Sequence, residues 1–211
     1  MKIAFALYES FTLLDTIGPF QVLSAIPGIE AGFVAEKRGS VRDHTGITSL
    51  EARWSFDDVR DPDVIVVPGG IGTERLIPAK HPILQWIRDV HPRTTWTTSV
   101  CTGSLLLAGA GLLNGIEATG HWAAMDLLRA LGAKPTPQRV VFQGKIVTAA
   151  GVSAGIDMAL ALVQRMSGTP LAQAIQLAIE YDPQPPLDAG SPAKAPKEIV
   201  ELVRALPGFS Q

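Results

Sequence analysis

The chain has 211 residues, of which 46% are hydrophobic and 18% are charged, which indicates one globular domain and excludes a disordered chain. Its net charge of -2 argues against a general nucleic-acid binder, which would carry a basic face. The single cysteine excludes an intrachain disulfide and fits a reducing compartment. No apolar stretch is long enough to cross a bilayer or resembles a signal peptide, so we expect a cytoplasmic protein without membrane contact.

Strand-like and helix-like segments alternate along the chain. Strands are expected at residues 2–8, 32–36, 47–52, 64–67, 94–100 and 117–119, and a hairpin at 139–142 and 145–148. Helices are expected at residues 19–25, 82–90, 102–113, 121–131, 154–166, 171–179 and 197–206. The alternation predicts an α/β fold with a flavodoxin-like, doubly wound and mostly parallel sheet that has helices on both faces.

The domain organisation is simple. No linker separates two cores, and no internal repeat occurs, so we expect one domain over residues 1–211. Within it, residues 182–196 are rich in Pro, Gly and Ala. We expect residues 182–211 to form a C-terminal extension packed on the domain.

Cys101 is the first candidate for chemistry. A lone cysteine is most often a buried core residue. Here, however, it lies where a β-branched strand meets a helix, among the small residues Ser99, Thr102, Gly103 and Ser104, which suits a strained nucleophile elbow. A helix start can also lower the pKa of a thiol and favour the reactive thiolate.

Asp15 follows the first strand, at the sheet edge where ligands bind in open α/β folds. An Asp that precedes Gly18-Pro19 is more often a helix cap or a turn residue. The functional alternative is a carboxyl group between two apolar runs, with a raised pKa, that acts as an acid.

The other candidates are a glycine loop and a histidine. Pro68-Gly69-Gly70-Ile71-Gly72 lacks the pattern of a phosphate loop and is either a plain turn or a place where backbone N–H groups face developing negative charge. His121-Trp122 opens a helix, where a surface or capping histidine is the common outcome. No ligand cluster with metal spacing occurs, so we predict no metal.

Several motifs together resemble a known superfamily. They are Leu14-Asp15-Thr16-Ile17-Gly18-Pro19, Pro68-Gly69-Gly70, Ser99-Val100-Cys101-Thr102-Gly103-Ser104, Ala118-Thr119-Gly120-His121-Trp122 and Ala150-Gly151-Val152-Ser153-Ala154-Gly155-Ile156-Asp157. Their order is similar to that of the class I glutamine amidotransferase-like (PfpI-type) superfamily. The tail at residues 176–192 resembles its isocyanide hydratase branch.

The resemblance implies a role for each matching residue. Cys101 would be the nucleophile, Asp15 the neighbouring acid, and Thr102 a hydrogen-bonding support for one of them. The backbone at Gly70 and Ile71, together with His121 and Trp122, would line the substrate site. Proteases of the superfamily place His directly after the cysteine; Thr102 stands there and argues against proteolysis.

The implied activity is conversion of a small isocyanide to an N-substituted formamide, without a cofactor, by a homodimer. Two other kinds of protein fit the same motifs. One is another cysteine-dependent enzyme, such as a glyoxalase or an amidase. The other is a non-catalytic sensor of a ligand or of oxidants, although a regulator of that kind usually carries a further DNA-binding module.

Overall fold

The computed structural model describes residues 1–206, and residues 207–211 lie outside the described part. The strands are β1 (Lys2–Ala6), β2 (Glu30–Ala35), β3 (Gly39–Arg42), β4 (Ser49–Ala52), β5 (Trp54–Ser55), β6 (Val64–Val67), β7 (Trp96–Val100), β8 (Glu117–Ala118), β9 (Lys134–Pro135), β10 (Val140–Gln143) and β11 (Ile146–Ala149). The α-helices are α1 (Leu13–Leu23), α2 (Thr73–Leu76), α3 (Pro82–Val90), α4 (Gly103–Gly109), α5 (Met125–Ala130), α6 (Ala154–Ser167), α7 (Thr169–Ala178) and α8 (Lys197–Ala205). Short 3-10 helices are η1 (Phe56–Asp58), η2 (His91–Arg93) and η3 (Trp122–Ala124).

A seven-stranded sheet forms the centre of the molecule, in the order β10-β11-β7-β6-β1-β2-β5. Every neighbouring pair is parallel except β10 and β11, which form an antiparallel hairpin at one edge. The inner strands β6 and β11 are buried along their whole length, as expected for strands that are covered on both faces. The predicted doubly wound, mostly parallel sheet is confirmed.

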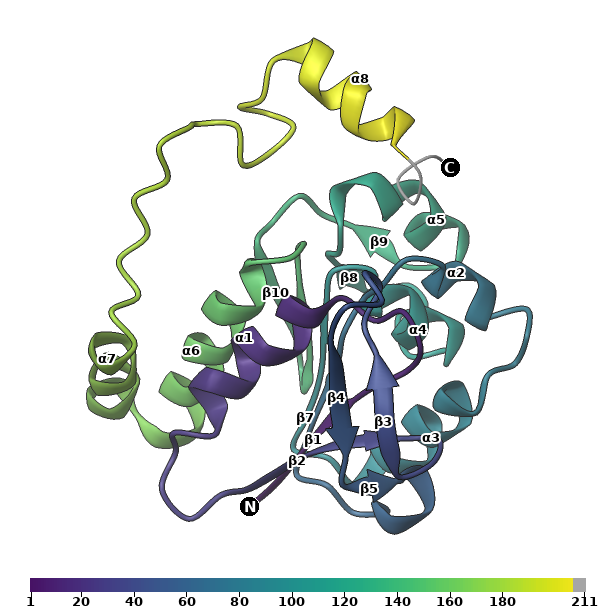
Figure 1. Ribbon diagram of the computed structural model, residues 1–211, viewed down its shortest axis with the longest axis vertical. Helices are drawn as coiled ribbons and strands as arrows, with labels where there is room; N and C mark the ends of the chain where they lie inside the picture. The colour runs from purple at the N-terminus through teal and green to yellow at the C-terminus, as the bar shows by residue number, and fades with distance from the viewer. Residues whose placement is uncertain (207–211) are drawn as a thin grey trace.

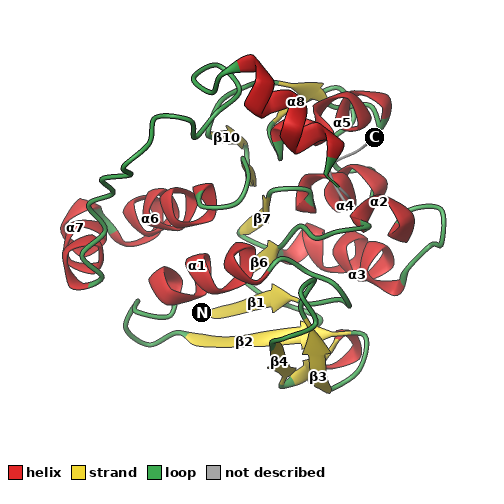
Figure 2. Cartoon of the chain, turned by 45° about the horizontal axis from the view of Figure 1, so that its top comes forward, coloured by secondary structure: helices red, strands yellow, loops and turns green. Residues whose placement is uncertain are grey.

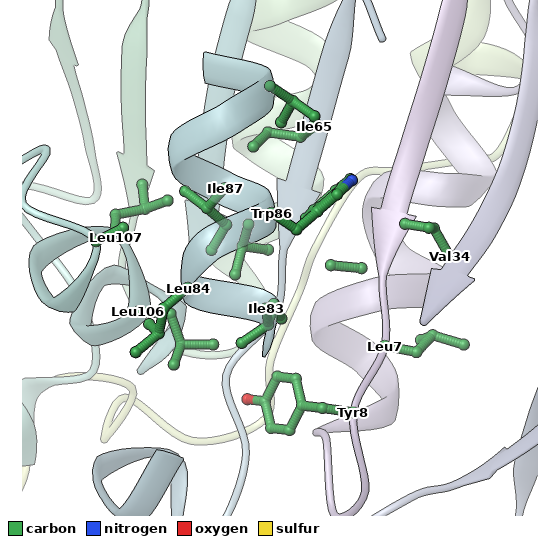
Figure 3. Packing of buried hydrophobic residues seen from close by; sticks show 14 of the residues in the cluster. Leu7, Tyr8, Val34, Ile65, Ile83, Leu84, Trp86, Ile87, Leu106 and Leu107 are labelled. Atoms are coloured by element: carbon green, nitrogen blue, oxygen red, sulfur yellow. The ribbon is translucent and has the colours of Figure 1, made fainter. Parts of the chain in front are cut away.

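The helices form two layers on the sheet. Figures 1 and 2 show α1, α6 and α7 on one side and α3 and α4 on the other. Each layer has its own apolar core: Met158 and Leu162 of α6 belong to one, and Ile83 and Leu106 belong to the other. Figure 3 shows the second core, with α3 packed between Leu106 and the strands. Burial of these two apolar faces is what fixes the helices on the sheet.

Several elements differ from the sequence prediction. Helix α1 begins at Leu13 instead of residue 19, so Pro19 lies inside it and Asp15 lies in its first turn. Helix α1 packs along α6, and a Cβ on Gly18 would come 3.1 Å from the Ile156 side chain. Tertiary packing therefore outweighs the preference of Pro19 for the start of a helix. The prediction also lacks β3, β5, β9 and α2; β5 forms an edge of the main sheet, whereas β3 pairs with β4 and β9 with β8 outside it.

The chain reverses its direction across the sheet at β1, which lies between β2 and β6. The crevice at such a reversal, beyond the carboxyl ends of the strands, is where doubly wound folds bind ligands. Three segments start there: α1 after β1, the loop at Pro68-Gly69-Gly70 after β6, and Cys101 after β7.

The C-terminal segment, defined here as residues 182–206, is built differently. Almost all its residues are exposed, and α8 contains no buried residue. Figure 1 shows it leaving α7, running outside the domain and ending in α8 next to α5. The predicted extension also includes residues 207–211, which lie outside the described residues. None of the helices within residues 1–206 is long and apolar enough to span a membrane.

Candidate active site

Cys101 occupies a sharp turn between β7 and α4. Its φ angle is 60°, a left-handed conformation that few residues other than glycine adopt. Its backbone N–H donates to the carbonyls of Ala149 and Ala150, at 3.1 and 3.2 Å. Ser104 Oγ donates to the Cys101 carbonyl. The side chain is 5% exposed. The predicted strand-to-helix elbow is therefore present, and β11 fixes its backbone.

Asp15 lies beside this elbow, in the first turn of α1, and is fully buried. The Gly69 N–H donates to Asp15 Oδ2 at 2.9 Å. No donor of residues 1–206 reaches Oδ1, and the Cys101 thiol is close enough to the carboxyl to influence its pKa. Burial raises the pKa of Asp15 from 3.8 to about 7, although the hydrogen bonds from Gly69 and Cys101 lower it in part.

The pKa of the Cys101 thiol is raised as well. Burial is the larger cause and the charge of Asp15 the second, while hydrogen bonds from the backbone and side chain of Thr102 lower it. The prediction that the helix start lowers the pKa of Cys101 is therefore wrong, because burial raises this pKa by more than the helix start lowers it. A thiol and a carboxyl that both hold their protons tightly can pass a proton between them near neutral pH.

The glycine loop after β6 connects the acid to Thr102. Gly69 N–H binds Asp15, and the next N–H, that of Gly70, donates to Thr102 Oγ1 at 3.0 Å. A Cβ on Gly69 would lie 2.5 Å from Thr102 Oγ1 and 2.6 Å from Thr102 N. Glycine is needed here because the two backbones approach so closely. The Gly69 N–H thus donates to the acid and the Gly70 N–H to Thr102, and a role of this loop toward developing negative charge on a substrate stays a prediction.

Two buried hydroxyl groups, those of Thr73 and Tyr8, also contact this loop. The sequence does not identify either residue as part of the site. Thr73 Oγ1 lies 3.1 Å from Thr102 Oγ1 and 3.0 Å from Tyr8 Oη. Thr73 donates to the Gly70 carbonyl and Tyr8 donates to the Pro68 carbonyl. Tyr8 follows β1, so its place at the functional edge of the sheet was a usable signal. Figure 3 shows its ring at the rim of the apolar cluster, below Ile83.

The rings of His121 and Trp122 lie next to each other, with centroids 5.6 Å apart, but their other neighbours differ. His121 is next to the segment that binds the Cys101 backbone, because a Cβ on Gly151 would lie 2.4 Å from His121 Cδ2. Burial lowers the pKa of His121, and its Nδ1 accepts from the Ala123 N–H. Trp122 instead contacts the C-terminal segment, where it lines a cavity of about 140 Å³ together with residues of α8.

Ile71 is the predicted site residue with the weakest connection to the elbow. Its side chain is 46% exposed at the surface. No contact between Ile71 and Cys101 or Asp15 occurs in the described structure, so its place in the site stays a prediction. Within residues 1–206, no three His, Cys, Asp or Glu side chains lie close enough together to hold a metal ion.

An open depression of about 250 Å³ lies elsewhere on the same edge of the sheet. Residues that follow β1 and β2 line it, among them Glu9 and Lys37, together with His81 from the segment before α3. Its lining includes Tyr8 but neither Cys101 nor Asp15, so the depression does not contain the elbow.

Known proteins are similar to this chain over most of its length. An isonitrile hydratase from Pseudomonas putida is 43% identical over 204 residues, which cover 97% of this chain and 89% of that protein. A solved structure of a ThiJ/PfpI family protein from Pseudomonas syringae is 36% identical, with a TM-score of 0.91, and covers 99% of this chain and 88% of the other.

More distant relatives share the fold. The structure of DJ-1beta from Drosophila melanogaster has a TM-score of 0.75 at 18% identity, over 85% of this chain and 97% of that one. The model of the DJ-1/PfpI family matches residues 1–165, which include β1, the glycine loop and Cys101. The chain therefore belongs to the DJ-1/PfpI family.

Proposed function

We propose that this protein is an isocyanide hydratase, which converts an isocyanide to an N-substituted formamide. The observation that carries the proposal is the buried pair of Cys101 and Asp15, in which the carboxyl has a pKa of about 7. Such a carboxyl can both give and take a proton at neutral pH, and both directions are needed to hydrate a carbon. The 43% identity to an isonitrile hydratase supports the same substrate class.

The first step forms a thioimidate. The Cys101 sulfur attacks the terminal isocyanide carbon, and a new S–C bond forms. The thiol proton passes to Asp15, and Asp15 delivers it to the same carbon, so that the product is R–N=CH–S–Cys101. No proton is exchanged with solvent in this step, because donor and acceptor are the buried pair itself.

The second step releases the formamide. Water attacks the thioimidate carbon, and the Asp15 carboxylate accepts one of its protons and passes it to the nitrogen, which gives the tetrahedral adduct R–NH–CH(OH)–S–Cys101. The C–S bond of this adduct then breaks, and the electrons of that bond return to sulfur. The hydroxyl proton of the adduct passes through Asp15 to the sulfur, so that R–NH–CHO leaves and the thiol is restored. Water and isocyanide are consumed in equal amounts, and no cofactor takes part.

The substrate site extends from the elbow to its neighbours. Thr102 supports the sulfur and holds the Gly70 N–H, and the backbone at Gly70 and Ile71 forms one wall. His121 and Trp122 form the other wall, next to Gly151. We expect a small organic substituent on the isocyanide nitrogen to lie between these two walls.

The test is turnover of a simple alkyl isocyanide by purified wild-type protein and two variants. Cys101→Ala is expected to abolish formamide formation. Asp15→Asn is expected to lower it by about 10²–10⁴-fold, the range for loss of a general acid-base group. Asp126→Asn, which changes an exposed carboxyl on α5, is the matched control and is expected to keep wild-type turnover. Near wild-type turnover in either site variant contradicts the mechanism.

A substrate panel separates this function from other thiol chemistry. The same samples are offered an α-oxoaldehyde and a primary amide, which a glyoxalase and an amidase would consume. We expect turnover of the isocyanide alone. If the wild-type protein does not convert the isocyanide but does convert the α-oxoaldehyde or the amide, Cys101 is the nucleophile of a different reaction.

The domain organisation and the assembly are further parts of the proposal. We infer one domain with residues 182–211 as its extension, acting as a homodimer in the cytoplasm. The family resemblance supports the dimer, and exposed apolar side chains of α8, such as Leu202, offer surface for contact with another chain. Light scattering of the purified protein is expected to give twice the mass of the chain.

A further inference from the structure

The hydroxyl groups of Tyr8 and Thr73 have no part in the reaction described so far. Both side chains are buried, and both face the loop that carries Gly69. We propose that Tyr8 and Thr73 are positioning residues, which fix the Pro68–Gly70 loop so that its N–H groups point at Asp15 and Thr102. The proposal rests on the proposed function only in so far as Asp15 is the acid of that reaction.

The two hydroxyl groups hold the carbonyls on either side of the Gly69 N–H. Tyr8 Oη donates to the Pro68 carbonyl at 3.0 Å, and Thr73 Oγ1 donates to the Gly70 carbonyl at 2.6 Å. The Pro68 carbonyl and the Gly69 N–H belong to one planar peptide, so the direction of one sets the direction of the other. Holding the carbonyl therefore aims the N–H at Asp15 Oδ2.

The same pair also acts on Thr102. Thr73 Oγ1 donates its own proton to the Gly70 carbonyl and can accept from Thr102 Oγ1 at 3.1 Å. Thr102 Oγ1 in turn accepts from the Gly70 N–H. Loss of the Tyr8 hydroxyl removes the donor to the buried Pro68 carbonyl, and loss of the Thr73 hydroxyl removes the shortest hydrogen bond to the Gly70 carbonyl.

The consequence concerns the protonation of the acid. The Gly69 N–H stabilises the charged form of Asp15 and so opposes the rise of its pKa that burial causes. A loosened loop weakens that hydrogen bond. The pKa of Asp15 then moves further up, and the carboxylate forms at a higher pH.

Few other ionisable groups face Asp15 in the described structure. Cys101 is its direct neighbour, and Tyr8 interacts with both, with Glu74 of α2 beyond it. On α6, which packs along α1, Asp157 is turned toward Arg139 instead. Burial raises the pKa of Tyr8 well above its usual value, so Tyr8 stays a neutral donor over the pH range of the test.

The experiment measures the rate at which iodoacetamide alkylates Cys101 as a function of pH. Cys101 is the single cysteine of the chain, so the reaction has one site. Asp15 and Cys101 titrate as a coupled pair, and the rate is expected to show an inflection where the pair loses its first proton. The proton that remains is shared between the carboxyl and the sulfur, so a fraction of the sulfur is then thiolate. In Thr73→Val and Tyr8→Phe this inflection is expected to move to higher pH, by about one unit when the Gly69 hydrogen bond is lost. Thr73→Ser, which keeps the hydroxyl, is expected to restore it.

A matched control lies at the opposite end of β7. Thr97 is also buried, and its hydroxyl also bonds to another threonine, Thr94, at 2.8 Å. Thr97→Val therefore removes a comparable buried hydroxyl without touching the loop. We expect it to lower the melting temperature about as much as Thr73→Val does and to leave the inflection where it is in the wild type.

The outcomes separate the two proposals. An unchanged inflection in both Tyr8→Phe and Thr73→Val, with melting losses like that of Thr97→Val, makes the pair merely structural and overturns the inference. If Thr73→Val does not fold, Tyr8→Phe, which keeps the ring and its packing, decides alone. Alkylation needs no isocyanide, so a shifted inflection in a protein that does not hydrate isocyanides refutes the proposed function and leaves the positioning role intact.

Discussion

The elbow at Cys101 and the C-terminal segment are held in place by very different numbers of partners. The elbow is fixed from β11, from the Gly69–Gly70 loop and from Ser104, and its side chains are buried. The C-terminal segment is exposed along residues 182–206 and contacts the domain chiefly around Trp122. The chemistry therefore depends on the part of the molecule in which every group is constrained by several others. Substitutions at the elbow are expected to alter stability and turnover more than substitutions in the C-terminal segment.

The largest effect is expected at Asp15. A buried carboxyl whose pKa rises from 3.8 in the unfolded chain to about 7 in the fold binds its proton more tightly when folded. As the pH rises from 3.8 to about 7, ionisation of Asp15 therefore lowers the free energy of unfolding. The total loss is about 4 kcal/mol once the pH is above 7. Asp15→Asn is expected to be more stable than the wild type at alkaline pH.

Chemical denaturation over a pH series measures this effect. The advantage of Asp15→Asn is expected to shrink as the pH falls from 7 through 3.8 and to vanish below that value, where the wild-type carboxyl is neutral in both states. Asp126→Asn controls for the loss of one charge. A constant difference at all pH values contradicts the raised pKa of Asp15.

Two leucines compare the regions directly. Leu106 of α4 is 0% exposed, whereas Leu202 of α8 is 58% exposed. Leu106→Ala is expected to lower the free energy of unfolding by about 2–5 kcal/mol, because it leaves a cavity in the core. Leu202→Ala is expected to change it by about 0.5 kcal/mol or less. Similar losses in the free energy of unfolding for both variants would show that α8 is an integral part of the fold. A repeat of the measurement at two protein concentrations reveals any contribution from dimerisation.

Two glycines give a smaller, local comparison. Gly69→Ala places a Cβ against the backbone of Thr102 and is expected to cost about 1–3 kcal/mol of stability, with a loss of turnover. Gly190, in the C-terminal segment, has no atom within 4 Å of the position that a Cβ would take. Gly190→Ala is therefore expected to leave melting and turnover unchanged. An inactive Gly190→Ala would connect that segment to the reaction.

The smallest effect concerns the attachment of α8. The Arg204 guanidinium lies 5.6 Å from the centre of the Trp122 ring, a cation-π contact worth about 0.5–1 kcal/mol at an exposed site. Arg204→Gln is expected to speed limited proteolysis within residues 182–206 and to leave the melting of the domain unchanged. Lys197→Gln removes a charge from the same helix and serves as the control, with cleavage at the wild-type rate.

The sequence was sufficient for the sheet and the elbow because their signals are local. The β-branched runs, the small residues around Cys101 and the motif order all lie within short stretches. Two features depended on distant contacts. Helix α1 starts earlier than Gly18-Pro19 indicated because it packs on α6. Tyr8 and Thr73 are 65 residues apart, so no local pattern brings their hydroxyl groups together.

The φ angle of 60° at Cys101 has a consequence for the stability of the chain. A left-handed backbone costs a residue with a Cβ roughly 1–2 kcal/mol, which glycine would not incur. The backbone at this turn would therefore be more stable with glycine, which carries no thiol. The fold presents its nucleophile at a position that its own backbone geometry disfavours.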